Sequence, residues 1–175
     1  MSVSTPVNIE QVFSAQEIAR RVAELGLEFR SAAREEDVFV LSILKGTICF
    51  AADLLRATPG PVSYGFVDVI RDVLDTETAA ALEIDFLSFT GITGRNVFLL
   101  KDVVSTGVIE TYLLSQLRMH EPKTLHLVAL LDRPDLRTMD LKADYRLFEA
   151  GAGSFVGYGL ESDNHHGNLP YIGRI

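Results

Sequence analysis

Hydrophobic and polar positions along the chain follow two repeating patterns. Short uninterrupted apolar runs at residues 38–44, 97–100 and 125–131 are typical of strands that are buried on both faces of a parallel sheet. The first two runs are each followed by a turn and then by apolar residues at helical spacing, at residues 48–56 and 108–117. The pattern therefore predicts a strand–turn–helix unit that occurs twice.

Further elements are predicted on both sides of these units. Ser14 and Glu17 stand three residues apart, as in a helix capping box, and apolar spacing continues that helix to about Ala33. Before it, residues 1–13 are expected to form a poorly structured lead-in. The remaining segments predict strands at residues 62–70, 82–89 and 145–148 and a surface loop at residues 71–80.

The alternation of strands and helices predicts the fold class. It indicates an α/β protein with a doubly wound, mostly parallel sheet flanked by helices, within a single domain that spans residues 1–175. Ligands of such sheets bind at the carboxyl ends of the strands. The residues of interest are therefore those that follow the apolar runs.

Composition and charge exclude several classes of partner. The formal net charge of -8 and the pI near 4.9 argue against nucleic acid and anionic membranes, which would repel the protein. No run approaches the length of a membrane span, and no charged start with an apolar core marks a signal peptide. The single cysteine, Cys49, is expected to be a buried structural thiol, and a reducing cytoplasmic location is the expectation.

Two turns at the predicted rim are candidates for binding an anion. Ser105, Thr106 and Gly107 present backbone N–H groups at a helix N-terminus, where the helix dipole also favours a phosphate. Lys45 and Gly46 end a second strand, where an ammonium group and the backbone can bind an anion. A purely structural role in an α/β protein is the alternative for both turns.

Several side chains near these turns have both a functional and a plain interpretation. Asp102 could accept hydrogen bonds from ribose hydroxyls and Lys101 could meet a phosphate, with a surface ion pair as the alternative. Lys142 could donate to a carbonyl oxygen of a base, or simply face solvent. Phe155 and Tyr158 could each stack on a planar heterocycle, or belong to the core.

Carboxylates and histidines near the end of the chain raise the question of a metal. Glu161 and Asp163 could hold Mg²⁺, a cation that prefers oxygen ligands. His165 and His166, with one distant cysteine, form no recognisable zinc pattern. Structural or surface roles are therefore expected for the two histidines.

Several segments in order resemble the bacterial hypoxanthine/guanine phosphoribosyltransferase family. They are residues 14–26, SILKGTICFAADLL at residues 42–55, LVALLDRP at residues 127–134, and the terminus FVGYGLESDNHHGNLPYIGRI. The family's terminus has the form Phe-Val-Val-Gly-Tyr-Gly-Leu-Asp, followed by Arg-Asn-Leu-Pro-Tyr-Ile-Gly. The match covers nearly the whole chain.

The resemblance implies a fold, a reaction and a set of partners. The fold is that of the type I phosphoribosyltransferases, with a small hood built from the terminal segments. The reaction transfers phosphoribosyl from phosphoribosyl pyrophosphate (PRPP) to a 6-oxopurine in purine salvage, with Mg²⁺ as cofactor and pyrophosphate as the leaving group. The expected partners are these small molecules rather than nucleic acid or a membrane, and the expected assembly is a homodimer or homotetramer.

The same resemblance assigns roles on the phosphate side of the site. Lys45 and Gly46 would face the pyrophosphate. The 5′-phosphate would be held by the second turn and the next backbone amides, that is by Thr106, Gly107, Val108 and Ile109.

On the base side, the resemblance implies three contacts with the purine. Lys142 would donate to the purine O6, Phe155 would stack on the ring, and Val156 would offer backbone groups to the base edge. Asp102 and Glu161 would be the metal ligands, and Asp102 would also act in catalysis.

The chain departs from the family pattern at residues that bind the substrate or take part in catalysis. The family's loop reads Glu-Asp-x-x-Asp-Thr-Gly-x-Thr, whereas this chain has Lys101 for the ribose-binding glutamate, Ser105 for the proton-accepting aspartate and Ile109 for the last threonine. Glu161 replaces an aspartate, and Gly167 replaces an arginine expected on pyrophosphate. A lost general base typically costs about 10²–10⁴-fold in rate.

These departures leave three interpretations open. The first is an active purine phosphoribosyltransferase, whose activity is reduced; the second is a catalytically degenerate purine-nucleotide-binding or regulatory protein on the same scaffold. The third is a subunit that mainly assembles with an active relative. The family's mobile-loop Ser-Tyr pair is also missing, because Ser63-Tyr64 falls in a predicted strand and the loop begins near residues 71–72.

Overall fold

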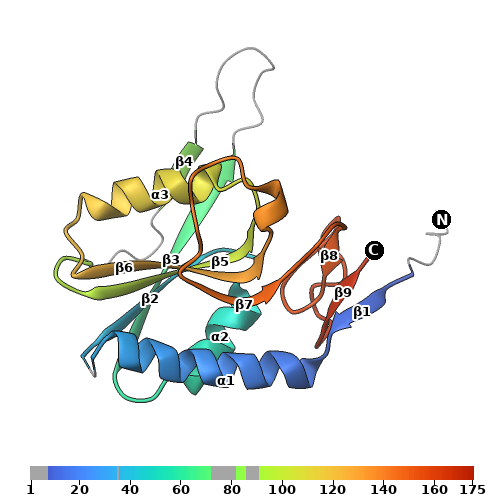
Figure 1. Ribbon diagram of the computed structural model, residues 1–175, viewed down its shortest axis with the longest axis horizontal. Helices are drawn as coiled ribbons and strands as arrows, with labels where there is room; N and C mark the ends of the chain where they lie inside the picture. Colours follow the sequence, from blue (N-terminus) through green and yellow to red (C-terminus); the bar gives the residue numbers. More distant parts are fainter. Residues whose placement is uncertain (1–7, 35, 72–81, 86–90) are drawn as a thin grey trace, which may run out of the picture.

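A six-stranded sheet forms the centre of the computed structural model, which describes residues 8–34, 36–71, 82–85 and 91–175 (Figure 1). The strand order is β4-β3-β2-β5-β6-β7, and every neighbouring pair is parallel except β3 and β4. The strands are β2 (Val38–Ile43), β3 (Val62–Arg71), β4 (Leu82–Asp85), β5 (Asn96–Val104), β6 (Thr124–Asp132) and β7 (Tyr145–Glu149). The predicted α/β fold with a mostly parallel sheet is confirmed.

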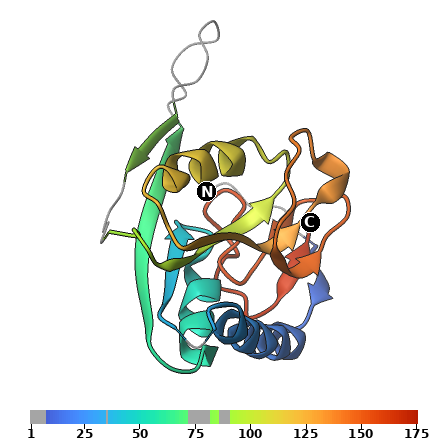
Figure 2. The same ribbon diagram turned by 60° about the vertical axis from the view of Figure 1, so that its left-hand side comes forward.

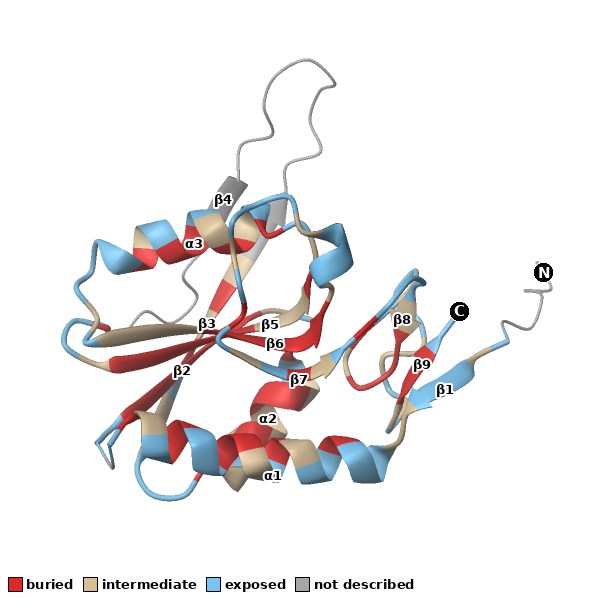
Figure 3. Ribbon diagram, viewed as in Figure 1, coloured by how far each residue is buried: buried red, intermediate tan, exposed pale blue. Residues whose placement is uncertain are grey.

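Helices cover both faces of this sheet (Figures 1 and 2). Helices α1 (Ala15–Ala32) and α2 (Ile48–Ala57) lie on one face, and α3 (Val108–Arg118) lies on the other. Alternate strand residues pack on opposite faces: Val38 belongs to the core with α1 and α2, and Phe39 belongs to the core with α3. The apolar runs are uninterrupted because both faces of each central strand are buried (Figure 3).

The first helix begins where the capping pattern predicts. The Ser14 side chain accepts from the backbone N–H of Glu17, and the Glu17 carboxylate accepts from the backbone N–H of Ser14 at 2.8 Å. Farther along the helix, the Phe29 ring stacks on Phe98 of β5 with 3.9 Å between ring centroids. This contact fixes α1 against the middle of the sheet.

A second, three-stranded antiparallel sheet is built from the two ends of the chain. It has the order β1-β9-β8 and consists of β1 (Glu10–Phe13), β9 (Ile172–Arg174) and β8 (Phe155–Val156). This small sheet agrees with the hood that the resemblance implies. The expectation of a poorly structured lead-in is wrong for residues 10–13, because their strand forms only by pairing with the far end of the chain; residues 1–7 lie outside the described residues.

Two other predictions are corrected or only partly covered. Strand β5 continues through Val104, so Lys101 and Asp102 lie inside it and do not end it. The strand predicted at residues 82–89 is described as far as Asp85, and most of the loop predicted at residues 71–80 lies outside the described residues. None of the described helices is both long and apolar enough to cross a membrane.

Candidate functional site

A cavity of about 440 Å³ opens at the carboxyl edge of the sheet, between the main sheet and the terminal segment. Lys45 and Gly46 follow β2, while Asp102 lies near the carboxyl end of β5, the strand that pairs with β2. The lining residues are Lys45, Gly46, Asp102, Val103, Phe155, Gly159, Leu160, Glu161, Asp163 and Asn164. The fold thus brings together five of the residues that the sequence predicts for the site: Lys45, Gly46, Asp102, Phe155 and Glu161.

The closest approach in this cavity is between Gly46 and Asp102. A Cβ atom at position 46 would overlap the Asp102 carboxylate, so any side chain there would have to displace that carboxylate. Gly159 lies on another side of the same turn, where its own Cβ would stand 2.6 Å from the Gly46 carbonyl oxygen. The Leu44–Lys45 peptide bond, just before this turn, is cis.

Two ammonium groups pair with carboxylates at the cavity. Lys45 Nζ lies 2.8 Å from Oε2 of Glu161 and donates to Oδ1 of Asn164 at 3.1 Å. Lys101 Nζ forms an ion pair with Oδ1 of Asp102, and the same oxygen accepts from the backbone N–H of Val103 at 2.8 Å. Lys101 therefore reaches the cavity only through Asp102.

These pairs bear on whether the chain holds Mg²⁺. Asp102 and Glu161 are the predicted metal ligands, but each already carries an ammonium group of the chain. In the part of the chain that the structure describes, no group of three or more His, Cys, Asp or Glu side chains is placed to hold a metal ion. In the structure, these two carboxylates are paired with lysines and form no preformed Mg²⁺ site.

The second predicted anion site, the turn before α3, lies beside this cavity and does not line it. Gly107 has φ of +85° and is the residue that precedes the helix, so the chain turns sharply there. The carbonyl oxygen of Thr106 accepts from the backbone N–H groups of Thr138 at 3.0 Å and Met139 at 3.1 Å. At the start of α3 the backbone N–H of Val108 donates to Oγ1 of Thr106 at 3.5 Å, and the N–H groups of a first helical turn are those that can bind an anion.

The turn also contacts buried charges, among which Arg137 is not singled out by the sequence analysis. The Arg137 side chain packs on Gly107 and forms an ion pair with buried Asp132, while its Nη1 has no hydrogen-bond partner among the described residues. Glu110, in the first turn of α3, is buried as well. Burial raises the pKa of the Glu110 carboxyl, and the nearby charges of Lys101 and Arg137 oppose that shift.

Of the residues predicted to contact the purine, only some lie at the cavity. Phe155 lines the cavity and packs against the core, so both of its interpretations hold. The Val156 side chain is buried, and β8 is an edge strand of its sheet, which leaves backbone groups on one side unpaired by a strand. Lys142 is exposed and does not line the cavity. The family pattern has two valines between its phenylalanine and its glycine, whereas this chain has only Val156 between Phe155 and Gly157.

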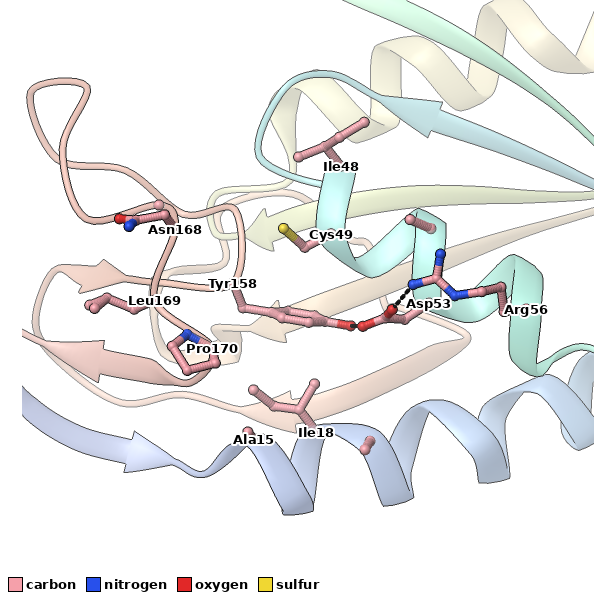
Figure 4. A pocket seen from close by; sticks show the side chains of 13 residues that line it. Ala15, Ile18, Ile48, Cys49, Asp53, Arg56, Tyr158, Asn168, Leu169 and Pro170 are labelled. Atoms are coloured by element: carbon pink, nitrogen blue, oxygen red, sulfur yellow. Dashed lines mark hydrogen bonds and ion pairs between the residues drawn. The ribbon is translucent and has the colours of Figure 1, made fainter.

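A second hollow of about 480 Å³ lies between α1, α2 and residues 167–170 (Figure 4). At its base the Tyr158 hydroxyl donates to Oδ2 of Asp53 at 2.7 Å, and Asp53 also pairs with Arg56. Burial and the Asp53 carboxylate raise the pKa of Tyr158, so its hydroxyl stays protonated. Cys49 lines this hollow half-buried, and burial raises the pKa of its thiol, which agrees with an unreactive side chain.

The two adjacent histidines lie on the same terminal loop. The Nδ1 atom of His165 lies 2.6 Å from the carbonyl oxygen of Asp163, and the His165 and His166 rings are tilted with 6.1 Å between centroids. The structural or surface role of the two histidines stays a prediction.

Comparisons with known proteins give one consistent family. The model of the phosphoribosyl transferase domain matches residues 8–163. The hypoxanthine-guanine phosphoribosyltransferase of Bacillus subtilis (strain 168) is 34% identical over 169 residues, which cover 96% of this chain and 94% of that protein.

Solved structures agree with this match. A hypoxanthine-guanine phosphoribosyltransferase of Bacillus anthracis has a TM-score of 0.86 at 30% identity, over 97% of this chain and 99% of that one. The hypoxanthine phosphoribosyltransferase of Trypanosoma cruzi, in complex with its product IMP, has a TM-score of 0.84 at 26% identity, over 94% of this chain and 92% of that one.

Proposed function

Because this chain belongs to the phosphoribosyl transferase family, we propose that it transfers the phosphoribosyl group of PRPP to a 6-oxopurine, a reaction of purine salvage. The observation that carries the proposal is the cavity at the carboxyl edge of the sheet. There the Lys45–Gly46 turn, Asp102 and Phe155 meet in one place, although they come from three distant parts of the sequence. Such an edge is where ligands of this sheet type bind.

The residues around the cavity provide the contacts that this substrate needs. Lys45 and the backbone at Gly46 bind the pyrophosphate group, and the turn at Thr106 and Gly107 binds the 5′-phosphate through backbone N–H groups. The Asp102 carboxylate accepts hydrogen bonds from the ribose. Together these contacts place C1 of the ribose beside the base, and positioning of this kind supplies a large part of a rate enhancement.

The chemical step needs a place for one proton. A ring nitrogen of the purine forms a bond to C1 while the bond from C1 to pyrophosphate breaks, and pyrophosphate leaves with the electron pair. The purine must also lose a proton, and no described residue hydrogen-bonds the Ser105 hydroxyl to make it a base. The proton therefore passes to water or to the leaving group, and we expect the rate to be lower by about 10²–10⁴-fold than with a carboxylate base.

A second candidate function is a purine-nucleotide-binding or regulatory role without turnover. Ser105 and the ion pair of Lys101 with Asp102 favour it, because both change the groups nearest to the reacting atoms. The nucleotide would occupy the same cavity and the same phosphate turn.

Turnover of hypoxanthine, guanine and xanthine with PRPP and Mg²⁺ tests the two candidates, with Ser105→Asp compared with the native protein. Ser115→Asp, the same change on an exposed position of α3, is the control. Native activity supports the enzyme, and activity only in Ser105→Asp locates the defect at the proton acceptor. Silence in both, together with heat on titration with GMP or IMP, supports the binding protein.

Three finer points accompany this proposal. Any Mg²⁺ that takes part would be carried by PRPP, since Asp102 and Glu161 pair with lysines of the chain. The acidic charge and the half-buried, protonated Cys49 thiol are compatible with a reducing cytoplasmic location. A homodimer or homotetramer remains the assembly that the resemblance predicts, and sedimentation of the native chain tests it.

A further inference from the structure

The positive charge at the cavity comes from two ammonium groups of the chain itself. Lys101 stands next to Asp102 on β5 and places its Nζ on Oδ1 of Asp102; the two side chains are only 17% and 24% exposed. On the other side of the cavity, Lys45 Nζ pairs with Glu161 at 2.8 Å. Two of the carboxylates that line the cavity, those of Asp102 and Glu161, therefore already have a cation beside them.

The composition of the cavity shows why such a cation matters. Three carboxylates line it, those of Asp102, Glu161 and Asp163, against the single ammonium group of Lys45. Pyrophosphate carries several negative charges, so a cavity with this lining alone would repel it. Lys101 adds a second ammonium group directly at the Asp102 carboxylate.

We propose that Lys101 is a built-in counter-charge that lets this cavity bind the pyrophosphate group of PRPP without Mg²⁺, an inference that rests on the proposed function. Mg²⁺ in proteins is usually bound by one or two carboxylates together with substrate phosphates. Here an ammonium group of the chain already pairs with Oδ1 of Asp102. The lysine carries positive charge to the place where the metal would carry it.

A purely structural role for Lys101 makes a different prediction. If the lysine only neutralises Asp102 and holds its side chain in place, pyrophosphate binding depends on Mg²⁺ to the same degree with and without the lysine. The dependence of binding on Mg²⁺, compared among variants, therefore separates the two roles.

The experiment is calorimetric titration of the full chain with inorganic pyrophosphate, once in EDTA and once in excess Mg²⁺. The variants are Lys101→Glu, which reverses the charge, and Lys101→Met, which removes it. The control is Lys123→Glu, which makes the same charge reversal just before β6, at the amino-terminal edge of the sheet, where Lys123 pairs with Glu36. Melting temperatures show whether each variant is folded.

We expect the native protein and Lys123→Glu to bind pyrophosphate in EDTA within about threefold of their affinity in Mg²⁺, a difference below about 0.7 kcal/mol. In EDTA, Lys101→Glu should bind pyrophosphate about tenfold or more weakly than the native protein does, a loss of about 1.4 kcal/mol in binding free energy. Excess Mg²⁺ should restore most of that affinity. The affinity of Lys101→Met for pyrophosphate in EDTA should lie between those of the native protein and Lys101→Glu.

Two results overturn the inference: a native protein that binds pyrophosphate only with Mg²⁺, and a Lys101→Glu variant that matches the native protein in EDTA. Titration with GMP in parallel separates this failure from failure of the proposed function. A native protein that binds GMP but not metal-free pyrophosphate refutes the role of Lys101 alone. A native protein that binds neither ligand in either buffer refutes both.

Discussion

Gly46 faces Asp102 at such short range that a Cβ atom on Gly46 would overlap Oδ2 of the Asp102 carboxylate. Gly46 follows β2 and Asp102 lies in β5, its parallel neighbour, and the two strands end at the same edge of the sheet. Lys101 holds the other oxygen of that carboxylate. The Asp102 side chain is therefore fixed from two directions, by a backbone and by an ammonium group.

Substitution Gly46→Ala should displace the Asp102 carboxylate and reduce PRPP use. A misplacement of about 1 Å can cost about 10²-fold in rate, so we expect a fall of that order in kcat/KM, or in nucleotide affinity if the protein does not turn over. Gly151→Ala is the matched control, because a Cβ there would meet nothing within 4 Å. Unchanged kinetics and binding in Gly46→Ala would show that the close contact has no bearing on the site.

Substitution Tyr158→Phe should destabilise the fold without touching the cavity. It removes the hydroxyl that donates to Asp53 at 2.7 Å and so loosens the terminal segment from α2. A hydrogen bond of this kind contributes about 1–2 kcal/mol to the free energy of unfolding, which urea denaturation measures. Tyr112→Phe, on an exposed face of α3, should change it by less than about 0.5 kcal/mol. Equal stability of the two variants would contradict the prediction.

Local signals account for much of the fold. The apolar run at β2 and the capping pair Ser14 and Glu17 depend on neighbours in sequence, and both elements form as predicted. Strand β1 could not be predicted in the same way, because its residue Glu10 pairs with Arg174 of β9 across almost the whole chain. A four-residue strand of that kind has too few positions to show a period.

Some residues of the candidate site could likewise be predicted from local sequence, and others could not. Lys45, Gly46 and Asp102 follow apolar runs, so the rule that ligands bind at carboxyl ends of strands places them together. Arg137 could not be found this way, because its contact with Gly107 depends on the path of an irregular segment after β6. The pairing of Lys101 with Asp102 was one of two open alternatives, and only side-chain positions decide it.

Substitution Glu110→Gln should stabilise the protein at neutral pH and not in acid. Burial raises the pKa of Glu110, so the folded state holds this proton more tightly than the unfolded state does. The free energy of unfolding therefore decreases as pH rises through the raised pKa, because the buried carboxyl must then ionise. Below the ordinary glutamate pKa of 4.5 the carboxyl is protonated in both states, and this cost is absent. We expect Glu110→Gln to raise the free energy of unfolding by about 1 kcal/mol at pH 7 and to leave it unchanged near pH 4.

Denaturant titrations at the two pH values measure this difference. Glu28→Gln, an exposed position on α1, is the control and should leave the free energy of unfolding unchanged at both. A Glu110→Gln variant that is less stable than the native protein at pH 7 would show that the attraction of Lys101 and Arg137 outweighs burial.

Substitution Arg137→Met should weaken binding of nucleotides but not of nucleosides. The Arg137 side chain packs on Gly107, in the turn that is proposed to hold the 5′-phosphate, and its buried Nη1 has no hydrogen-bond partner in the part of the chain that the structure describes. Loss of one charge-assisted hydrogen bond, about 1.5–3 kcal/mol, should reduce GMP or IMP affinity by about tenfold or more. Guanosine and inosine lack the phosphate, so their affinity should not change.

The ratio of nucleotide to nucleoside affinity, measured by calorimetry, isolates this effect from loss of stability. Loss of stability is expected too, by about 3 kcal/mol, because the variant leaves buried Asp132 with only Arg146 at 3.5 Å among its described ion-pair partners. Arg118→Met, at the exposed end of α3, is the control. If Arg137→Met weakens nucleosides and nucleotides equally, the arginine supports the fold of the turn and does not contact the phosphate.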